Sequence, residues 1–139
     1  LEGQLLKDRV KTVMDRFDIH PYGNGLCDKL STGQKQRVNI ARTILHDPPV
    51  LFFDEPTSGL DVVLSQDVME FVEEAKTLGK TVIYCTHIMS EVEKLCDTVG
   101  IIHDGRLLAE GSWAELKTRF GETDMEDIFV KVVGESPVV

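Results

Sequence analysis

The sequence predicts an α/β fold with a mostly parallel sheet and flanking helices. Stretches with apolar residues at helical spacing alternate along the chain with short apolar runs. The apolar run 50–53 and the β-branched run 81–86 are separated by a helical pattern over 62–78, which is the strand, helix, strand order of parallel sheets. With 139 residues, 42% of them hydrophobic, the chain is long enough to bury one core.

Two helices precede the first predicted strand. Apolar side chains recur at helical spacing over 5–17, and the pattern stops at the proline- and glycine-containing stretch 21–25. Ser31 and Thr32 are residue types that cap helices, and they predict the start of a second helix that runs to about residue 45. A proline pair ends that helix.

The first predicted strand, 50–53, is a continuous apolar run, which is typical of a strand buried on both faces of a parallel sheet. Asp54 and Glu55 follow directly and are therefore expected at its carboxyl end. The helix over 62–78 is closed by Gly79, because glycine readily adopts the left-handed conformation at a helix end.

The last third of the chain predicts a hairpin and three short helices. A strand over 98–103 turns through Asp104 and Gly105 into a strand over 106–109, because an Asp-Gly pair suits a tight hairpin turn. Capping-box patterns predict the three helix starts, at Ser90 with Glu93, Ser112 with Glu115, and Thr123 with Glu126.

Composition narrows the function classes. A net charge of -9 argues against a surface that attracts nucleic acid or anionic lipid, so contact with protein is expected instead. Cys27, Cys85 and Cys96 are widely spaced, which indicates neither a disulfide framework nor a zinc site and fits a reducing compartment. The longest apolar run is far short of the roughly 18 residues that span a bilayer. Because the chain enters a helical pattern directly from Leu1, we expect a fragment of a longer protein.

Four motifs follow one another along the chain: Leu30-Ser31-Thr32-Gly33-Gln34, the pair Asp54-Glu55 after an apolar run, the loop 56–61, and His87 after the second strand. Together they resemble the second half of the nucleotide-binding subunit of ATP-binding cassette (ABC) transporters, from about residue 28 to residue 111. Any one of these motifs alone would be weak, whereas four in family order are highly specific. The resemblance implies an incomplete P-loop NTPase fold of the ABC ATPase type.

In that family the first motif, the signature, lies at a helix N-terminus. The resemblance implies that Ser31, Thr32, Gly33 and Gln34 face the γ-phosphate of an ATP bound on the opposite subunit. Unpaired amides and the helix dipole favour an anion at such an end. The structural alternative is an ordinary N-cap with a glycine in the first turn.

The resemblance assigns Mg²⁺, held through water, to Asp54 and the polarisation of the attacking water to Glu55. Adjacent carboxylates on an extended chain project to opposite faces, so they can divide these duties. The alternative is a solvated strand end. Among the remaining residues, the resemblance implies that His87 donates a hydrogen bond to the γ-phosphate, although a lone histidine is otherwise usually structural.

In the loop 56–61, Ser58, Gly59 and Asp61 resemble the segment that meets its twin across the ATPase dimer and couples the two sites. Gly59 has the alternative role of a turn residue. The domain organisation implied is a remnant of the helical subdomain over 1–29, the C-terminal half of the catalytic core over 30–111, and a C-terminal helical extension over 112–139.

The phosphate-binding motif GxxxxGK[ST] does not occur in the sequence. In the family its strand lies between the strands that match 81–86 and 98–103, so the P-loop strand is absent here. Two interior strand edges would then present unpaired backbone groups, and we expect the isolated chain to be marginally stable. We also expect it to be inactive alone, because positioning the phosphates is most of phosphoryl-transfer catalysis.

The implied cofactors are ATP and Mg²⁺, and the implied partners are a second ATPase subunit, paired head to tail, and a transmembrane permease. The protein would then be cytoplasmic and peripheral on the membrane, with no nucleic acid. The segment 86–93 and the short acidic tail look most like the sodium-exporter branch, with drug exporters next. The alternatives are a soluble ABC ATPase acting on ribosomes or DNA and a non-catalytic truncated product.

Overall fold

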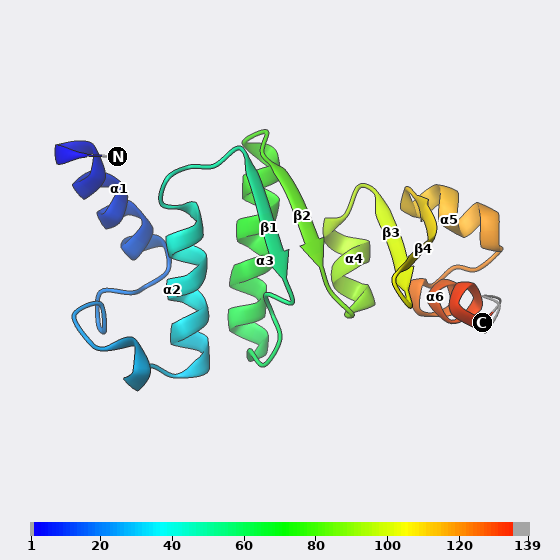
Figure 1. Cartoon of the computed structure of the whole chain (residues 1–139), viewed down its shortest axis with the longest axis horizontal. Helices are drawn as coiled ribbons and strands as arrows, with labels where there is room; N and C mark the ends of the chain where they lie inside the picture. Colours follow the sequence, from blue (N-terminus) through cyan, green and yellow to red (C-terminus); the bar gives the residue numbers. More distant parts are fainter. Residues whose placement is uncertain (1, 135–139) are drawn as a thin grey trace. The chain divides into compact units, whose positions relative to one another are not determined.

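The computed structural model describes residues 2–134 (Figure 1). They form two compact units, unit 1 (Leu1–Cys85) and unit 2 (Thr86–Val139). Both units combine helices with strands, and β1, α3 and β2 follow one another in unit 1, so the predicted α/β class is confirmed. The predicted division at residues 29 and 111 concerns functional parts and stays a prediction.

Unit 1 contains the two predicted helices, the predicted strand, helix, strand segment and one further turn of helix. Its elements are α1 (Gly3–Arg16), the 3-10 helix η1 (Cys27–Lys29), α2 (Thr32–Ile44), β1 (Val50–Asp54), α3 (Val62–Thr77) and β2 (Thr81–Cys85). Except for η1, which was not predicted, each element begins and ends within two residues of its predicted bounds. Gly79, at φ 77°, closes α3 as expected.

The strands β1 and β2 pair in parallel, from Val50 opposite Thr81 to Asp54 opposite Cys85. α3 packs on one face of this pair, where Leu51 and Phe53 are 1% and 6% exposed. The ring of Phe53 meets that of Phe71 on α3 edge to face, with centroids 6.1 Å apart. This face is the core of unit 1.

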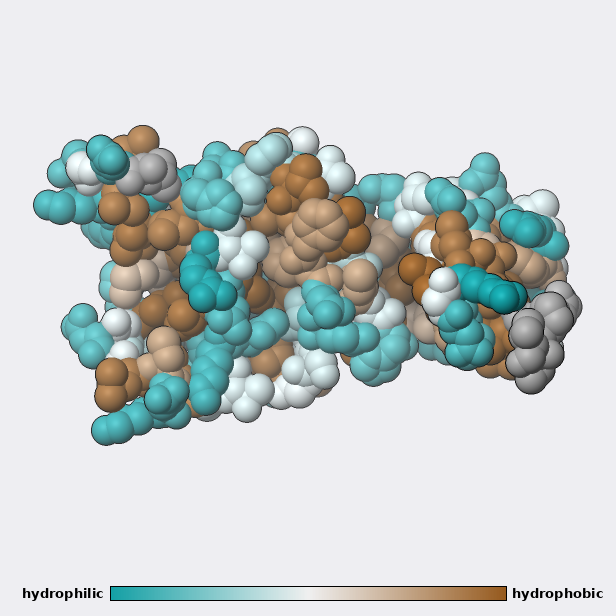
Figure 2. All heavy atoms as spheres, in the orientation of Figure 1, coloured by the Kyte–Doolittle hydropathy of each residue, from teal (hydrophilic) through white to brown (hydrophobic). Residues whose placement is uncertain are grey.

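The prediction that β1 is buried on both faces is wrong within the described residues of unit 1. Phe52 is 69% exposed and its cross-strand partner Ile83 is 43% exposed. Side chains alternate between the faces of a strand, and α3 covers one face only. Apolar side chains consequently gather on the uncovered face over the two strands, as Figure 2 shows.

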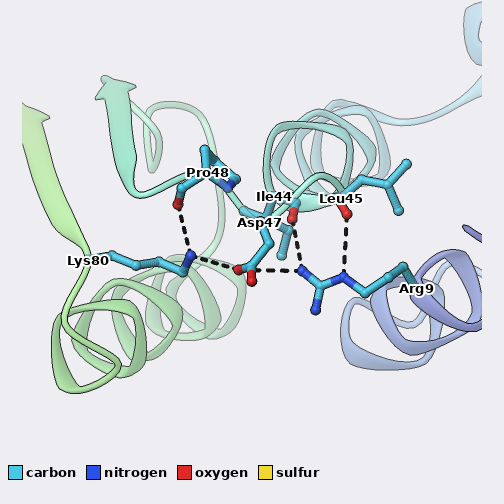
Figure 3. A network of polar contacts seen from close by, with 6 residues as sticks. All are labelled: Arg9, Ile44, Leu45, Asp47, Pro48 and Lys80. Atoms are coloured by element: carbon cyan, nitrogen blue, oxygen red, sulfur yellow. Dashed lines mark hydrogen bonds and ion pairs between the residues drawn. The ribbon is translucent and has the colours of Figure 1, made fainter. Parts of the chain in front are cut away.

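The connection from α2 to β1 is held by an ion pair with the start of β2. Lys80 Nζ donates to Asp47 Oδ1 at 2.7 Å and to the carbonyl oxygen of Pro48 at 2.8 Å (Figure 3). Asp47 has φ 57°, a left-handed conformation that aspartate tolerates better than most residues. The Lys80 side chain is 17% exposed, whereas that of Asp47 is 62% exposed, so solvent reaches this contact from the side of Asp47.

Arg9 joins α1 to the same connection. Its guanidinium lies 3.4 Å from Asp47 Oδ1 and points at the last carbonyl groups of α2, those of Ile44 and Leu45 (Figure 3). A cation at the C-terminal end of a helix satisfies carbonyl groups that lack a partner within the helix. Asp47 is therefore the shared acceptor that links α1, the end of α2 and the start of β2.

Replacing Asp47 with alanine is expected to lower the melting temperature of the chain, because Lys80 and Arg9 lose their common acceptor. The hydrogen bond from Lys80, and then its positive charge, hold the pKa of Asp47 below the usual value for an aspartate. The stabilisation is thus complete above the ordinary aspartate pKa of about 3.9 and is lost as pH falls through the lower folded-state pKa.

Circular dichroism melts at pH 7 and at pH 3 test this role of Asp47. The difference between wild type and Asp47→Ala should be present at pH 7 and smaller at pH 3. Asp28→Ala, on the exposed 3-10 helix η1, is the control and should change neither melt. Equal melting temperatures for wild type and Asp47→Ala at pH 7 would show that the contact contributes nothing.

Unit 2 contains the predicted hairpin and the three predicted short helices. Its elements are α4 (Met89–Leu95), β3 (Val99–His103), β4 (Arg106–Gly111), α5 (Trp113–Phe120) and α6 (Met125–Gly134). The hairpin turns at Asp104 and Gly105, with φ 47° and 71°, as the sequence predicts. One sheet face carries its core, formed by Val92, Val99, Ile101, Ala109, Leu116, Met125, Ile128 and Val132.

One of the three predicted capping boxes is confirmed. Ser112 Oγ accepts a hydrogen bond from the Glu115 amide at 3.3 Å, and Glu115 Oε2 accepts one from the Ser112 amide at 2.8 Å. The cap predicted at Thr123 is wrong, because the Glu126 amide donates instead to Asp124 Oδ1 at 2.9 Å. Threonine and aspartate both cap helices, and Thr123 and Asp124 are adjacent in the sequence.

The cap predicted at Ser90 is also wrong, although a short helix does begin there. α4 starts at Met89, and its N-cap residue Ile88 has no side-chain cap. The hydroxyl of Thr86 accepts a hydrogen bond from the Ile88 amide at 3.0 Å and donates one to Glu91 Oε2 at 2.9 Å. Thr86 therefore organises the entry to α4 from outside the helix.

Candidate functional site

The signature segment forms the N-terminus of α2. Ser31 is its N-cap, and its Oγ accepts from the Gln34 amide at 3.2 Å, while Gln34 Oε1 accepts from the Ser31 amide at 3.0 Å. Ser31 and Thr32 are exposed and Gly33 is half-buried. The segment is thus a capped helix end with the positive end of the dipole facing solvent, which is compatible both with an anion site and with an ordinary cap.

Gly33 lies close to the first turn of α3, so that a larger residue here would displace the Leu64 side chain. A Cβ atom on Gly33 would lie 2.5 Å from Leu64 Cδ1, a distance that side chains do not reach. Leu64 stands in the first turn of α3, and its amide donates to Asp61 Oδ1 at 3.0 Å. The structure therefore brings the start of the signature helix against the start of the helix that Asp61 caps.

The two adjacent carboxylates occupy different environments at the end of β1. Asp54 is exposed, whereas Glu55 is partly buried and its Oε2 is shielded from solvent. The Glu55 amide donates to the carbonyl oxygen of Cys85 at 2.9 Å, which extends the β1–β2 pairing by one residue. Glu55 also has φ 46°, a conformation that is strained for a residue other than glycine. The backbone turns sharply at this carboxylate.

The loop that follows Glu55 is ordered by backbone hydrogen bonds. The Ser58 amide donates to the Glu55 carbonyl and the Leu60 amide to the Thr57 carbonyl, both at 3.1 Å. Thr57 is 3% exposed, whereas Ser58 and Gly59 are exposed at the outer bend. Gly59 has φ 72°, a left-handed conformation that favours glycine. This fits the alternative interpretation of Gly59 as a turn residue.

Gln36 connects the signature helix to this loop, and the sequence analysis did not single it out. Its Nε2 donates to the carbonyl oxygen of Pro56 at 2.8 Å. Pro56 is fully buried, so its carbonyl would otherwise lack a partner in water. No sequence signal marks such a residue, because its partner is a backbone atom whose position depends on the fold.

Arg37 holds the helices of unit 1 together. Its guanidinium donates to the carbonyl oxygen of Phe17 at 3.3 Å and to Asp67 Oδ2 at 3.2 Å. Asp67 lies on α3, and Phe17 directly follows α1. These two hydrogen bonds give Arg37 a structural role in unit 1.

His87 lies in unit 2 and is exposed, between β2 and α4. It follows Thr86, whose hydroxyl organises the entry to α4, so its backbone is fixed by the hydrogen bonds of Thr86. The other predicted site residues, from Ser31 to Asp61, all lie in unit 1. The role of His87 stays a prediction.

An acidic group in unit 2 has a structural explanation. Carboxylate oxygens of Glu93, Asp124 and Glu126 lie within 4.8 Å of one another, and all three residues are exposed. Glu93 Oε1 accepts from the Met125 amide at 3.2 Å and Asp124 Oδ1 from the Glu126 amide at 2.9 Å. The hydrogen bond shared with Asp124 raises the pKa of Glu126 above its usual value. Glu93 and Asp124 thus cap the start of α6.

Comparison with known proteins supports the resemblance seen in the sequence. Residues 4–58 match the family described as ABC transporter. The chain is 38% identical over 125 residues to the ABC transporter ATP-binding protein NatA of Bacillus subtilis, covering 90% of this chain and 51% of that protein. It is 34% identical over 133 residues to the linearmycin resistance ATP-binding protein LnrL of the same organism, covering 96% and 43%.

Solved structures show the same fold. The ATP-binding subunit of an ABC transporter matches with a TM-score of 0.87 and 27% identity, over 96% of this chain and 56% of that one. The ATP-binding cassette MJ0796, described as a dimer bound to ADP and Pi, matches with a TM-score of 0.71 and 26% identity, over 81% and 49%. The incomplete ABC ATPase fold predicted from the sequence is confirmed.

The chain is therefore similar in sequence and in fold to part of the ATP-binding domain of ABC transporters. It spans about half the length of the curated relatives it matches. Within residues 2–134, no helix has the length and apolar character needed to cross a bilayer.

Proposed function

We propose that this chain belongs to the ABC transporter ATP-binding family and is the C-terminal part of a subunit that binds and hydrolyses ATP to drive transport across a membrane. One observation carries the proposal. The signature helix and the loop after Glu55 are tied within one folded unit by the contact of Gly33 with Leu64 and by the bond from Gln36 to Pro56. Residues that the family uses for ATP thus form one connected structure.

The signature supplies the anion-binding end of α2. We propose that Ser31, Thr32, Gly33 and Gln34 contact the γ-phosphate of an ATP held by a second subunit. The amides of a first helical turn point along the helix axis toward such a ligand, and the dipole favours its negative charge. In the free chain, Ser31 and Gln34 satisfy one another through the capping box, and Thr32 stays exposed.

Asp54 and Glu55 divide the remaining duties. Asp54 offers an exposed carboxylate at a strand end, which fits a hard cation such as Mg²⁺, and it would hold that ion through water. When bound, Mg²⁺ would neutralise charge on the phosphates. Glu55, partly shielded from solvent, would orient the attacking water and accept its proton. His87 would donate to the γ-phosphate.

A head-to-tail pair of subunits follows from the proposed role of the signature. If the signature contacts ATP that is bound by another subunit, a second ATPase subunit is needed. Ser58, Gly59 and Asp61 would contact the same residues of that second subunit. The related cassette MJ0796 is described as a dimer, which supports this arrangement. A transmembrane permease would place the pair on the cytoplasmic face of the membrane. The net charge of -9 favours protein partners over nucleic acid.

The transported substrate is proposed only as a class. The segment 86–93 resembles the sodium-exporter branch, and export is the direction we propose, with sodium ahead of drugs. The relative LnrL is named for linearmycin resistance, which favours an exporter as well.

We propose the predicted division for the parts of the chain: helical-subdomain remnant over 1–29, catalytic core over 30–111, and helical extension over 112–139, of which 135–139 lie outside the described residues.

A mixing assay tests the proposed function. The purified chain alone should show no Mg-ATP hydrolysis, because it supplies no phosphate-binding loop. Adding a polypeptide that corresponds to the part of B. subtilis NatA this chain does not match should produce turnover. Hydrolysis by the chain alone that Glu55→Gln abolishes would contradict the proposed inactivity. A mixture that associates but never turns over ATP would contradict the catalytic role.

A further inference from the structure

We propose that Gln36 is a positioning residue that couples the signature helix to the loop carrying Glu55. Its side chain reaches from the second turn of α2 to the carbonyl oxygen of Pro56, 2.8 Å away. Pro56 directly follows Glu55 in the chain. A movement of α2 therefore pulls on the residue next to the carboxylate proposed to act on water.

The conformation of this loop depends on the contacts that hold it. Glu55 holds a left-handed backbone conformation at φ 46°, which is unfavourable for a residue other than glycine. Strained residues persist only where their surroundings hold them. The turn bonds from Ser58 and Leu60 hold the loop from within, and Gln36 holds it from a different helix.

The signature helix is well suited to transmit a movement. Ser31 and Gln36 stand in one continuous helix, stiffened at its start by the capping box with Gln34. The same helix end, at Gly33, also lies close to the Leu64 side chain at the start of α3. Displacement of the first turn by a ligand is thus passed both to Pro56 and to the helix that Asp61 caps.

The consequence for turnover rests on the proposed function. The signature would contact ATP held by the partner subunit, whereas Glu55 would serve the ATP site of its own half. The bond from Gln36 to Pro56 would then make the position of Glu55 depend on ATP at the other site. In this arrangement Gln36 would contact neither the nucleotide nor the attacking water, so its effect would be on turnover rather than on ATP affinity.

Hydrogen exchange on the chain tests the contact independently of the proposed function. Gln36→Met keeps the size of the side chain and removes the donor. The Ser58 and Leu60 amides should then exchange about fivefold faster, the effect of one lost hydrogen bond on local opening. The amide of Val72, in the core of α3, should be unchanged. Faster exchange of all three amides would indicate a merely structural role and overturn the proposal.

Two further variants sharpen this test. Gln36→Lys keeps a donor of similar reach and should restore the exchange rates of Ser58 and Leu60 to near those of wild type. Lys35→Met, on the exposed face of the same helix, should leave them unchanged. Unchanged rates in Gln36→Met, or no recovery in Gln36→Lys, would overturn the coupling.

The mixing assay supplies the functional measurement. Gln36→Met should lower kcat about tenfold at an unchanged KM for ATP, as expected when a catalytic group loses its orientation. An unchanged kcat, or a raised KM at constant kcat, would overturn the positioning role. If the wild-type mixture shows no turnover, the proposed function fails, while the exchange rates still decide whether Gln36 holds the loop.

Discussion

Replacing Glu55 with glutamine is expected to reduce ATP turnover in the mixing assay by at least about a hundredfold, the usual effect of removing a general base. Glutamine keeps the size and hydrogen-bonding reach of the side chain but cannot take a proton from water. Because Glu55 is only partly exposed and its Oε2 is shielded, solvent cannot readily replace it. Steady-state phosphate release at saturating Mg-ATP measures the effect.

Two controls make the Glu55 result specific. Glu73→Gln removes an exposed carboxylate on α3 and should leave kcat unchanged. The KM for ATP of Glu55→Gln should also stay near that of wild type, since the side chain acts on water and not on the nucleotide. Turnover by Glu55→Gln within a factor of about two of wild type would remove Glu55 from the mechanism.

Leu51→Ala is expected to destabilise unit 1 by about 2–5 kcal/mol, the range for a leucine truncated in a packed core. Leu51 is 1% exposed and lies on the face of β1 that α3 covers. Since small domains have a total stability of only about 5–15 kcal/mol, the loss removes much of the resistance to urea.

The neighbouring residue provides a matched control for Leu51. Phe52 is 69% exposed on the opposite face of the same strand, so Phe52→Ala should cost less than about 1 kcal/mol. Urea titrations of the two variants compare the two faces directly. Equal destabilisation by Leu51→Ala and Phe52→Ala would mean that both faces of β1 are buried, as the sequence predicts.

The positions of the helices and strands were predictable because they depend on local signals. The capped start of α2 at Ser31, the closing Gly79 and the Asp104-Gly105 turn all specify their conformation within a few residues. The burial of β1 was not predictable in the same way. A run such as Val50 to Phe53 shows that a strand is apolar, whereas the faces that are covered depend on which helices pack there.

The candidate site likewise contains residues that the sequence reveals and contacts that depend on the fold. Ser31, Asp54 and Glu55 could be selected because residue type and spacing reveal them. The bond of Gln36 could not, since its partner is the backbone of Pro56, twenty residues away in sequence. The predicted cap at Thr123 was wrong because the adjacent Asp124 accepts from the Glu126 amide instead. The one at Ser90 was wrong because α4 begins one residue earlier, at Met89.

Turnover measured while the chain is titrated into a fixed amount of the complementary NatA part tests the central claim most directly. If the chain supplies the signature and Glu55 to a composite ATP site, phosphate release should rise from zero and saturate at one chain per complementary part. The Glu55→Gln chain should bind with the same stoichiometry and give no rise. A rate that stays at zero for the wild-type complex, or that rises equally with Glu55→Gln, would contradict the account.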